Sequence, residues 1–123
     1  MFIFSTDKDF TKRKNYRSRN GFVSFMRKGG KPSGIINISQ KLLWQTPLST
    51  YAKVGIDKEN NEMIICFTHD GNLKVVTSTS VTHIILHELF IYAGYDESEI
   101  PVGRFTADID KHGYIHVYLN KPL

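Results

Sequence analysis

Short runs of β-branched and aromatic residues, bounded by clusters of turn-forming residues, make up most of this chain after residue 20. The turn clusters are residues 29–34 (Gly-Gly-Lys-Pro-Ser-Gly), 57–61, 69–72 and 111–113. Because β-branched and aromatic side chains favour extended backbone and Gly, Asn and Asp favour turns, this spacing predicts strands joined by hairpins. The predicted strands are residues 22–28, 35–38, 51–56, 62–68, 73–77, 81–85, 104–110 and 114–119.

Two short segments break the strand pattern and predict helices. Ser39 is a suitable N-cap for a helix over residues 40–45, which Pro47 would end. Residues 86–93 form the second predicted helix, with Gly94 as its C-cap. The expected fold class is therefore α+β and strand-dominated, with antiparallel sheets and two short helices.

The second part of the chain repeats the order of elements in the first. Residues 51–56 and 104–109 are both predicted strands, and each is followed by Asp-Lys and a turn. This predicts a tandem strand–helix–strand–hairpin repeat, although a meandering antiparallel sheet would give similar matches by chance. We expect a basic N-terminal arm (1–20), a first β-rich half (21–69) and a second β-rich half (70–123) within one compact domain.

Charge is distributed unevenly along the sequence. Residues 1–50 hold ten Lys and Arg against two Asp, a net charge of +8. Residues 51–123 hold six Lys and Arg against ten Asp and Glu, a net charge of −4. A field separated in this way attracts a polyanion to one part of the molecule. No catalytic motif stands out, so the sequence predicts a binding protein and not an enzyme.

The most basic segment, residues 11–19, contains five Lys and Arg, and Tyr16 among them is able to stack on an exposed base. A second basic group lies at the glycine-rich turn near residue 30. Cationic side chains gain affinity for nucleic acid by releasing the counterions condensed on its phosphates. We therefore expect a small DNA-binding protein of regulatory or accessory type. The expected nucleic-acid-binding residues are Lys12, Arg13, Lys14, Arg17, Arg19, Arg27, Lys28 and Lys31.

The basic segment is also compatible with two further roles. It is typical of a solubilising tail, and it fits an acidic protein partner. With an acidic partner the chain would be a phage- or plasmid-borne interaction protein that inhibits a host protein by binding its acidic or nucleic-acid-binding surface. A homodimer is compatible with either kind of partner.

Histidines give a weaker signal, for a metal site. His83 and His87 are four residues apart, which on a helix would place both rings on one face. The β-branched residues around His83 instead favour a strand, where residues four apart are too distant to share a metal ion. His69, His112 and His116 have no ligand spacing.

Carboxylates also fail to predict a catalytic site. Asp108 and Asp110 share one face of a predicted strand and are able to act as acid and base. Asp110 more simply begins a turn, as Asp57 does in the first half. The acidic group at residues 96–99 predicts a solvated loop. We expect no catalytic residue, no metal site and no cofactor.

The single cysteine, Cys66, lies in the apolar run of residues 63–67, which predicts a buried, unreactive thiol. The apolar stretch of residues 81–93 is interrupted by polar side chains, so we expect no transmembrane segment. Asp7 and Asp9 follow the first residues, where a secretion signal would have a basic and then a long apolar region. We therefore expect a cytoplasmic protein with no membrane partner.

Residues 21–67 resemble an AbrB-like (swapped-hairpin) DNA-binding domain. A basic strand (22–28) and a turn precede a second strand (34–38), one helical turn, and a closing hairpin formed by residues 51–56 and 63–67. A tandem of two such units in one chain is similar to the arrangement of the MraZ family.

The resemblance implies that Arg27, Lys28 and Lys31 contact DNA. Leu43 and Trp44 stand where the family has helix arginines. The implied contacts are therefore to the phosphate backbone and not to particular bases.

Overall fold

The computed structural model describes residues 1–5, 21–43, 45–46, 49–77 and 82–123. Nine strands and two short α-helices lie in this part of the chain. The elements are β1 (Ile3–Phe4), β2 (Gly21–Lys28), β3 (Lys31–Ile38), α1 (Gln40–Leu43), β4 (Tyr51–Asp57), β5 (Glu62–Phe67), β6 (Leu73–Thr77), β7 (Thr82–Ile85), α2 (His87–Tyr92), the 3-10 helix η1 (Glu97–Glu99), β8 (Gly103–Ile109) and β9 (Ile115–Pro122).

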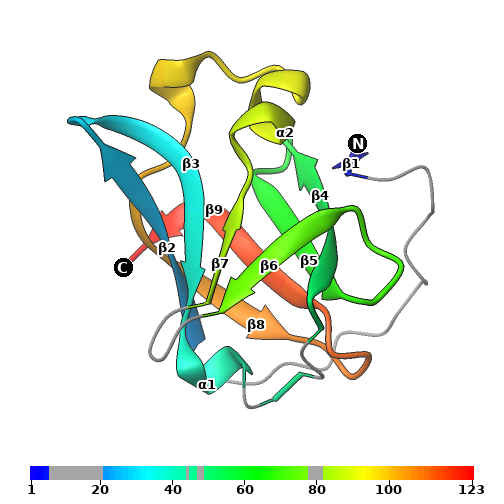
Figure 1. Cartoon of the computed structure of the whole chain (residues 1–123). Coiled ribbons are helices and arrows are strands. Elements are labelled where there is room, and N and C mark those ends of the chain that lie inside the picture. The colour runs from blue at the N-terminus through cyan, green and yellow to red at the C-terminus, as the bar shows by residue number, and fades with distance from the viewer. Residues whose placement is uncertain (6–20, 44, 47–48, 78–81) are drawn as a thin grey trace.

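Eight of these strands close into an antiparallel β-barrel (Figure 1). Their order around the barrel is β4-β5-β9-β8-β2-β3-β7-β6, and β6 pairs back to β4. β1 pairs with β4 outside this ring. The predicted α+β fold, with antiparallel sheets and helices in a strand–helix–strand–hairpin repeat, is therefore wrong. The apolar alternation that predicted the strands is the same in an open sheet and in a barrel, and here the two edges of the sheet pair with each other.

The two halves of the chain contribute alternately to the ring. The hairpin β4-β5 lies beside β8-β9, which lies beside β2-β3, which lies beside β6-β7. Neither residues 21–69 nor residues 70–123 form a continuous sheet alone, so both halves complete one core. The pairing scheme is unchanged when β2, β3, β4 and β5 are exchanged for β6, β7, β8 and β9. Each half has the order hairpin, helix, hairpin, which differs from the predicted repeat.

The barrel closes where β4 meets β6. Tyr51 pairs with Lys74 and Ala52 with Leu73, and further along β4 the same edge pairs with β1. Gly71, just before β6, lies so close to Ala52 that an added Cβ would clash with the Ala52 backbone. A residue without a side chain is therefore needed for β6 to reach β4. Shifts of register in the β2-β3 and β8-β9 pairs are β-bulges, which add the bend that closure requires.

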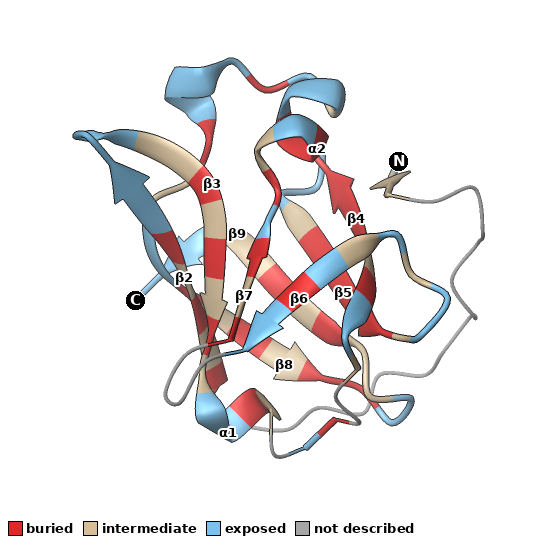
Figure 2. Cartoon of the chain, in the orientation of Figure 1, coloured by how far each residue is buried: buried red, intermediate tan, exposed pale blue. Residues whose placement is uncertain are grey.

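The hydrophobic core fills the barrel interior. In Figure 2 the strands alternate buried and more exposed positions, because every second side chain points inward. β5 is an exception and is buried at nearly every position. Cys66 in β5 is buried, as predicted, and burial raises the pKa of its thiol. The bulkiest fully buried side chains include Ile36, Leu42, Ile56, Met63, Ile65, Ile84, Leu86, Phe90 and Ile115.

Most of the predicted elements are confirmed to within a few residues. β3 begins at Lys31, earlier than predicted, because the turn before it needs only two glycines. Ser39 precedes α1 as expected, but its hydroxyl oxygen accepts a hydrogen bond from the backbone N–H of Phe22 at 3.2 Å. This hydrogen bond joins the start of α1 to β2, and the Ser39 carbonyl oxygen accepts hydrogen bonds from the backbone N–H groups of Leu42 (3.1 Å) and Leu43 (3.2 Å). Gly94 follows α2 with a φ of 100°, which favours glycine.

Asp57 ends β4 and is almost fully buried. Its Oδ1 accepts hydrogen bonds from the Met1 ammonium (3.0 Å) and the Asn60 backbone N–H (3.3 Å), and its Oδ2 accepts one from Asn60 Nδ2 (2.7 Å). Burial acts to raise the pKa of Asp57, but these hydrogen bonds outweigh it and hold the pKa below its usual 3.8. The charged carboxylate therefore stabilises the β4-β5 turn.

We expect Asp57→Asn to make the fold less sensitive to acid. A carboxyl group with a lowered pKa in the folded state contributes stability at neutral pH, and this contribution is lost as the pH falls through the folded pKa. The free energy of unfolding in urea should fall more steeply for the wild type than for the variant between about pH 6 and about pH 3. Glu88→Gln, at an exposed side chain on α2 that forms no ion pair with another described residue, is the control and should keep the wild-type slope. Equal slopes for wild type and Asp57→Asn would contradict the prediction.

The Tyr95 hydroxyl is buried and has no hydrogen-bond partner among the described residues. Its ring packs edge-on against Phe90, with 5.1 Å between centroids, and Lys58 Nζ lies 5.1 Å from the Tyr95 centroid. Burial, followed by the negative charges of Glu99 and Asp57, raises the pKa of Tyr95. The ring therefore stabilises the core while the hydroxyl loses its hydration without compensation.

Tyr95→Phe should consequently keep the stability of the wild type or increase it by up to about 1 kcal/mol, because it removes the unpaired hydroxyl and keeps the ring. Urea denaturation of both proteins measures the difference. A loss of more than about 1 kcal/mol would show that the hydroxyl has a partner in solution.

Candidate nucleic-acid interface

The β2-β3 hairpin carries three of the predicted nucleic-acid-binding residues. Gly29 and Gly30 form its turn with φ values of 61° and 79°, as a two-residue hairpin loop of this kind requires. Arg27, Lys28 and Lys31 flank the turn and are exposed, and the tip projects beyond the barrel (Figures 1 and 2). The structure therefore brings these three cations together. The other five predicted residues lie outside the described residues: Lys12, Arg13, Lys14, Arg17 and Arg19.

The hairpin tip has an unfavourable arrangement of charge. Lys28 and Lys31 lie directly opposite each other in the pairing register, where like charges destabilise a sheet. Neither lysine forms an ion pair with another residue that the structure describes. The Arg27 guanidinium donates a hydrogen bond to the Gly30 carbonyl oxygen at 3.1 Å, which fixes it beside the turn.

The strands on this side of the barrel contain no acidic residue. β6, β7, β3 and β2 are neighbours, and their sequences hold four Lys and Arg and no Asp or Glu. The opposite strands β4, β5 and β8 contain Asp57, Glu62 and Asp108. We call the outer surface of β6, β7, β3, β2 and the adjoining Arg104 of β8 the basic face.

Two cations of the basic face were missed by the sequence analysis. Lys74 and Arg104 belong to the acidic second half of the chain, and they join Arg27, Lys28 and Lys31 only because the halves alternate around the barrel. No local sequence signal points to them, because Arg104 lies on β8, beside β2, and Lys74 lies on β6, beyond β7 from β3, and only the strand pairing shows this.

A row of outward-facing residues crosses the basic face from strand to strand. Val76 pairs with His83, His83 with Asn37, Asn37 with Ser24, and Ser24 with Arg104. We call these five residues the cross-strand row. The Arg104 guanidinium lies over the Phe22 ring, 4.7 Å from its centroid, so a cation–π contact holds the guanidinium in place.

A shallow depression of about 340 Å³ lies between the cross-strand row and the hairpin tip. Ser33 Oγ donates to the Met26 carbonyl oxygen at 2.8 Å, and Asn37 Nδ2 donates to Met26 Sδ at 3.1 Å. These contacts hold the bulged part of β2 against β3. The residues around the depression are Met26, Arg27, Lys28, Ser33, Ile35, Asn37 and His83.

The predicted metal and acid–base candidates do not come together as pairs. His83 lies in β7 and His87 begins α2, so they do not share a helix face, and His87 Nε2 instead lies 3.7 Å from Glu97 Oε1. Asp108 is partly exposed on β8, whereas Asp110 is buried after the strand ends. Within the described residues, no group of three or more His, Cys, Asp and Glu is arranged to hold a metal ion.

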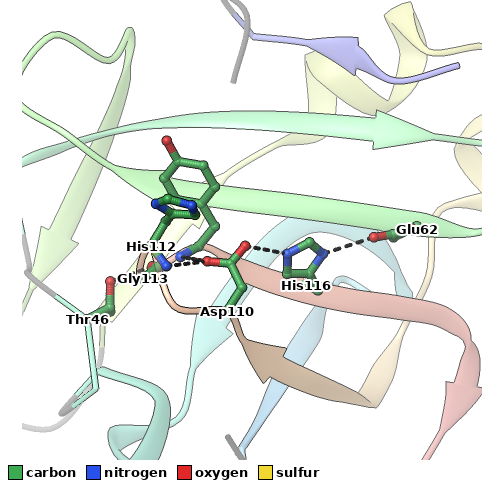
Figure 3. Close-up of polar contacts among 7 residues, drawn as sticks. Thr46, Glu62, Asp110, His112, Gly113 and His116 are labelled. Atoms are coloured by element: carbon green, nitrogen blue, oxygen red, sulfur yellow. Dashed lines mark hydrogen bonds and ion pairs between the residues drawn. The ribbon is translucent and has the colours of Figure 1, made fainter. Parts of the chain in front are cut away.

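A partly buried polar cluster joins β5, β9 and the turn after β8 (Figure 3). His116 Nδ1 lies 3.0 Å from Glu62 Oε1, and His116 Nε2 lies 2.9 Å from Asp110 Oδ2. Asp110 Oδ1 also accepts hydrogen bonds from the backbone N–H groups of His112 (2.9 Å) and Tyr114 (3.1 Å). Asp110 therefore organises a turn, as predicted. Its contact with His116, 6 residues further on, was missed. The contact of His116 with Glu62 was missed as well, because 54 residues separate the two in the sequence.

The cluster ties β5 and β9 to the turn after β8. A carboxylate only accepts, so both contacts of His116 are hydrogen bonds when both ring nitrogens carry a proton. The nearby Thr46 hydroxyl donates to the Gly113 carbonyl oxygen at 2.6 Å and is thus already engaged.

His116→Ala should destabilise the protein by about 3 kcal/mol, because it leaves the buried Asp110 carboxylate and the half-buried Glu62 without their shared partner. Urea denaturation measures this loss. His69→Ala, at an exposed turn, is the matched control and should change stability by less than about 0.5 kcal/mol. Equal stability of His116→Ala and wild type would show that the cluster does not hold the strands together.

No helix in the described residues is long and apolar enough to span a bilayer. The chain has no match among known protein families, curated proteins or solved structures. Conclusions about function therefore depend on the geometry of the basic face alone.

Proposed function

We propose that this protein binds nucleic acid, DNA in the first instance, through the basic face, in a regulatory or accessory role and without catalysis. The observation that carries the proposal is the absence of any Asp or Glu from β6, β7, β3 and β2, together with their four Lys and Arg. An ordinary solvated surface mixes both signs of charge. A surface with cations alone attracts a polyanion and repels a basic face of its own kind.

The hairpin tip supplies the most direct phosphate contacts in this proposal. Lys28 and Lys31 repel each other in the free protein, and a phosphate between them relieves this repulsion. The relief of repulsion adds to the favourable free energy of phosphate binding. Arg27, held at the Gly30 carbonyl, is already oriented and loses little freedom on binding.

The proposal includes two expectations from the sequence, the resemblance to AbrB-like domains and a cytoplasmic location. The resemblance assigns DNA contacts to Arg27, Lys28 and Lys31, which the hairpin gathers at one exposed tip. The buried free thiol of Cys66 is compatible with a reducing compartment.

An acidic protein is the second candidate partner. The observation in its favour is the exposure of aliphatic side chains on the basic face, above all Ile85 at 58%. Such side chains are common at the centre of protein interfaces, where they are desolvated. In this case the protein would act as an inhibitor that covers an acidic or nucleic-acid-binding surface of its target.

Reversing the charge of the hairpin tip should weaken nucleic-acid binding. We expect the double variant Lys28→Glu, Lys31→Glu to lose at least about tenfold in affinity for a random DNA oligonucleotide at low salt, measured by fluorescence anisotropy. The slope of log affinity against log salt concentration should also become shallower by about two, since each lost phosphate contact releases about one counterion fewer.

Lys111→Glu is the control, because Lys111 is exposed on the β8-β9 turn, away from the basic face. Its affinity should stay within about twofold of the wild type. Wild-type binding that does not change with salt, or an equal loss in Lys111→Glu, would contradict the proposed function.

A further inference from the structure

We infer that the basic face binds a single-stranded segment of nucleic acid, with bases against the cross-strand row and phosphates at the cations around it. This inference rests on the proposed function and adds the form of the ligand. It follows from three properties of the face: the side chains of the row, the exposed aliphatic residues beside it, and the placement of the cations.

The cross-strand row provides a continuous platform. Val76, His83, Asn37, Ser24 and Arg104 lie on five adjacent strands in a single register. Since neighbouring strands are about 4.8 Å apart, the row is about 19 Å long measured along the barrel wall, around which it curves. Bases of an extended strand that crosses the β-strands can lie along it one after another.

Each side chain of the row suits an exposed base. The imidazole of His83 and the guanidinium of Arg104, supported on Phe22, offer flat surfaces for stacking. Ser24 and Asn37 between them carry hydrogen-bonding groups able to reach base edges. His83 makes no hydrogen bond to another described residue, and its half-buried ring lies on the outer side of β7.

The aliphatic side chains favour a single strand over a duplex. Ile85 is 58% exposed, Met26 39% and Val76 37%, and all lie on the basic face. A duplex presents phosphates and sugars to a barrel wall and keeps its bases stacked inside, so these side chains would gain nothing from it. The unstacked bases of a single strand have apolar faces that bury such residues.

The cations lie where the backbone of such a strand would pass. Arg27 and Lys28 line the depression on one side of the row, and Lys31 pairs with Lys28 at the hairpin tip. Lys74 lies on β6, at the far end of the row. No carboxylate of β2, β3, β6 or β7 interrupts this path. Charge complementarity therefore selects a polyanion, and the exposed aliphatic side chains on the basic face select one with exposed bases.

The experiment compares labelled single-stranded DNA, single-stranded RNA and duplex DNA of one sequence by fluorescence anisotropy. The wild type should bind at least one single strand about tenfold or more tightly than the duplex. His83→Ala and Ile85→Ser should each weaken single-strand binding by at least about fivefold and leave duplex binding unchanged. Ile91→Ser is the matched control, because Ile91 is 42% exposed on α2, outside the basic face, and it should bind like the wild type.

The possible results separate this inference from the proposed function. Preference for DNA or for RNA supports it equally and identifies the source of the strand. Duplex binding that is as tight as single-strand binding, with no effect of Ile85→Ser, would overturn the inference and leave the proposed function intact. No binding of any nucleic acid at low salt, with all variants folded by circular dichroism, would overturn both and leave the acidic protein as the candidate partner.

Discussion

The closure of the barrel at the short contact between β4 and β6 is the constraint on which the rest of the structure depends. Two residue pairs make the contact, and Gly71 leaves room for it beside Ala52. Once the ring is closed, every strand in it has an inner and an outer face and neighbours on both sides. Inner residues then form one core, and outer residues from distant parts of the chain become neighbours. The basic face is a result of this closure.

Two buried aspartates support the closed ring at corresponding places. Asp57 is the last residue of β4 and Asp110 comes directly after β8, and each accepts hydrogen bonds from backbone N–H groups of the turn that comes next. Their third partner differs, since the first contacts the Met1 ammonium and the second contacts His116. A buried carboxylate is costly without such partners, so these hairpins are held by hydrogen-bonded groups. The outer surface of the strands that they join is thereby kept in register.

The sequence predicted the strands well and their arrangement poorly, for a physical reason. Turns are local, so Gly29-Gly30 and the Asp-Lys turns could be identified from a few neighbouring residues. Pairing partners are set by contacts between distant residues, which alternation alone does not encode. The same limit applies to the site: Arg27, Lys28 and Lys31 are close in sequence and were found. His83, Arg104 and the other members of the cross-strand row come from five strands and were not.

The ion pairs among the described residues lie outside the basic face, and this distribution favours a binding role for that face. Ion pairs among the described residues join Met1 to Asp57 and Glu59, Lys58 to Glu99, His87 to Glu97, and His116 to its two carboxylates, all outside the basic face. These acidic groups therefore stabilise turns and strand ends. Lys28, Lys31 and Lys74 have no counterion among the described residues. Three cations on one face that have no counterion among the described residues repel one another, which costs stability. That cost is offset when an external polyanion occupies the face, which is why the charge pattern argues for binding more strongly than for solubility.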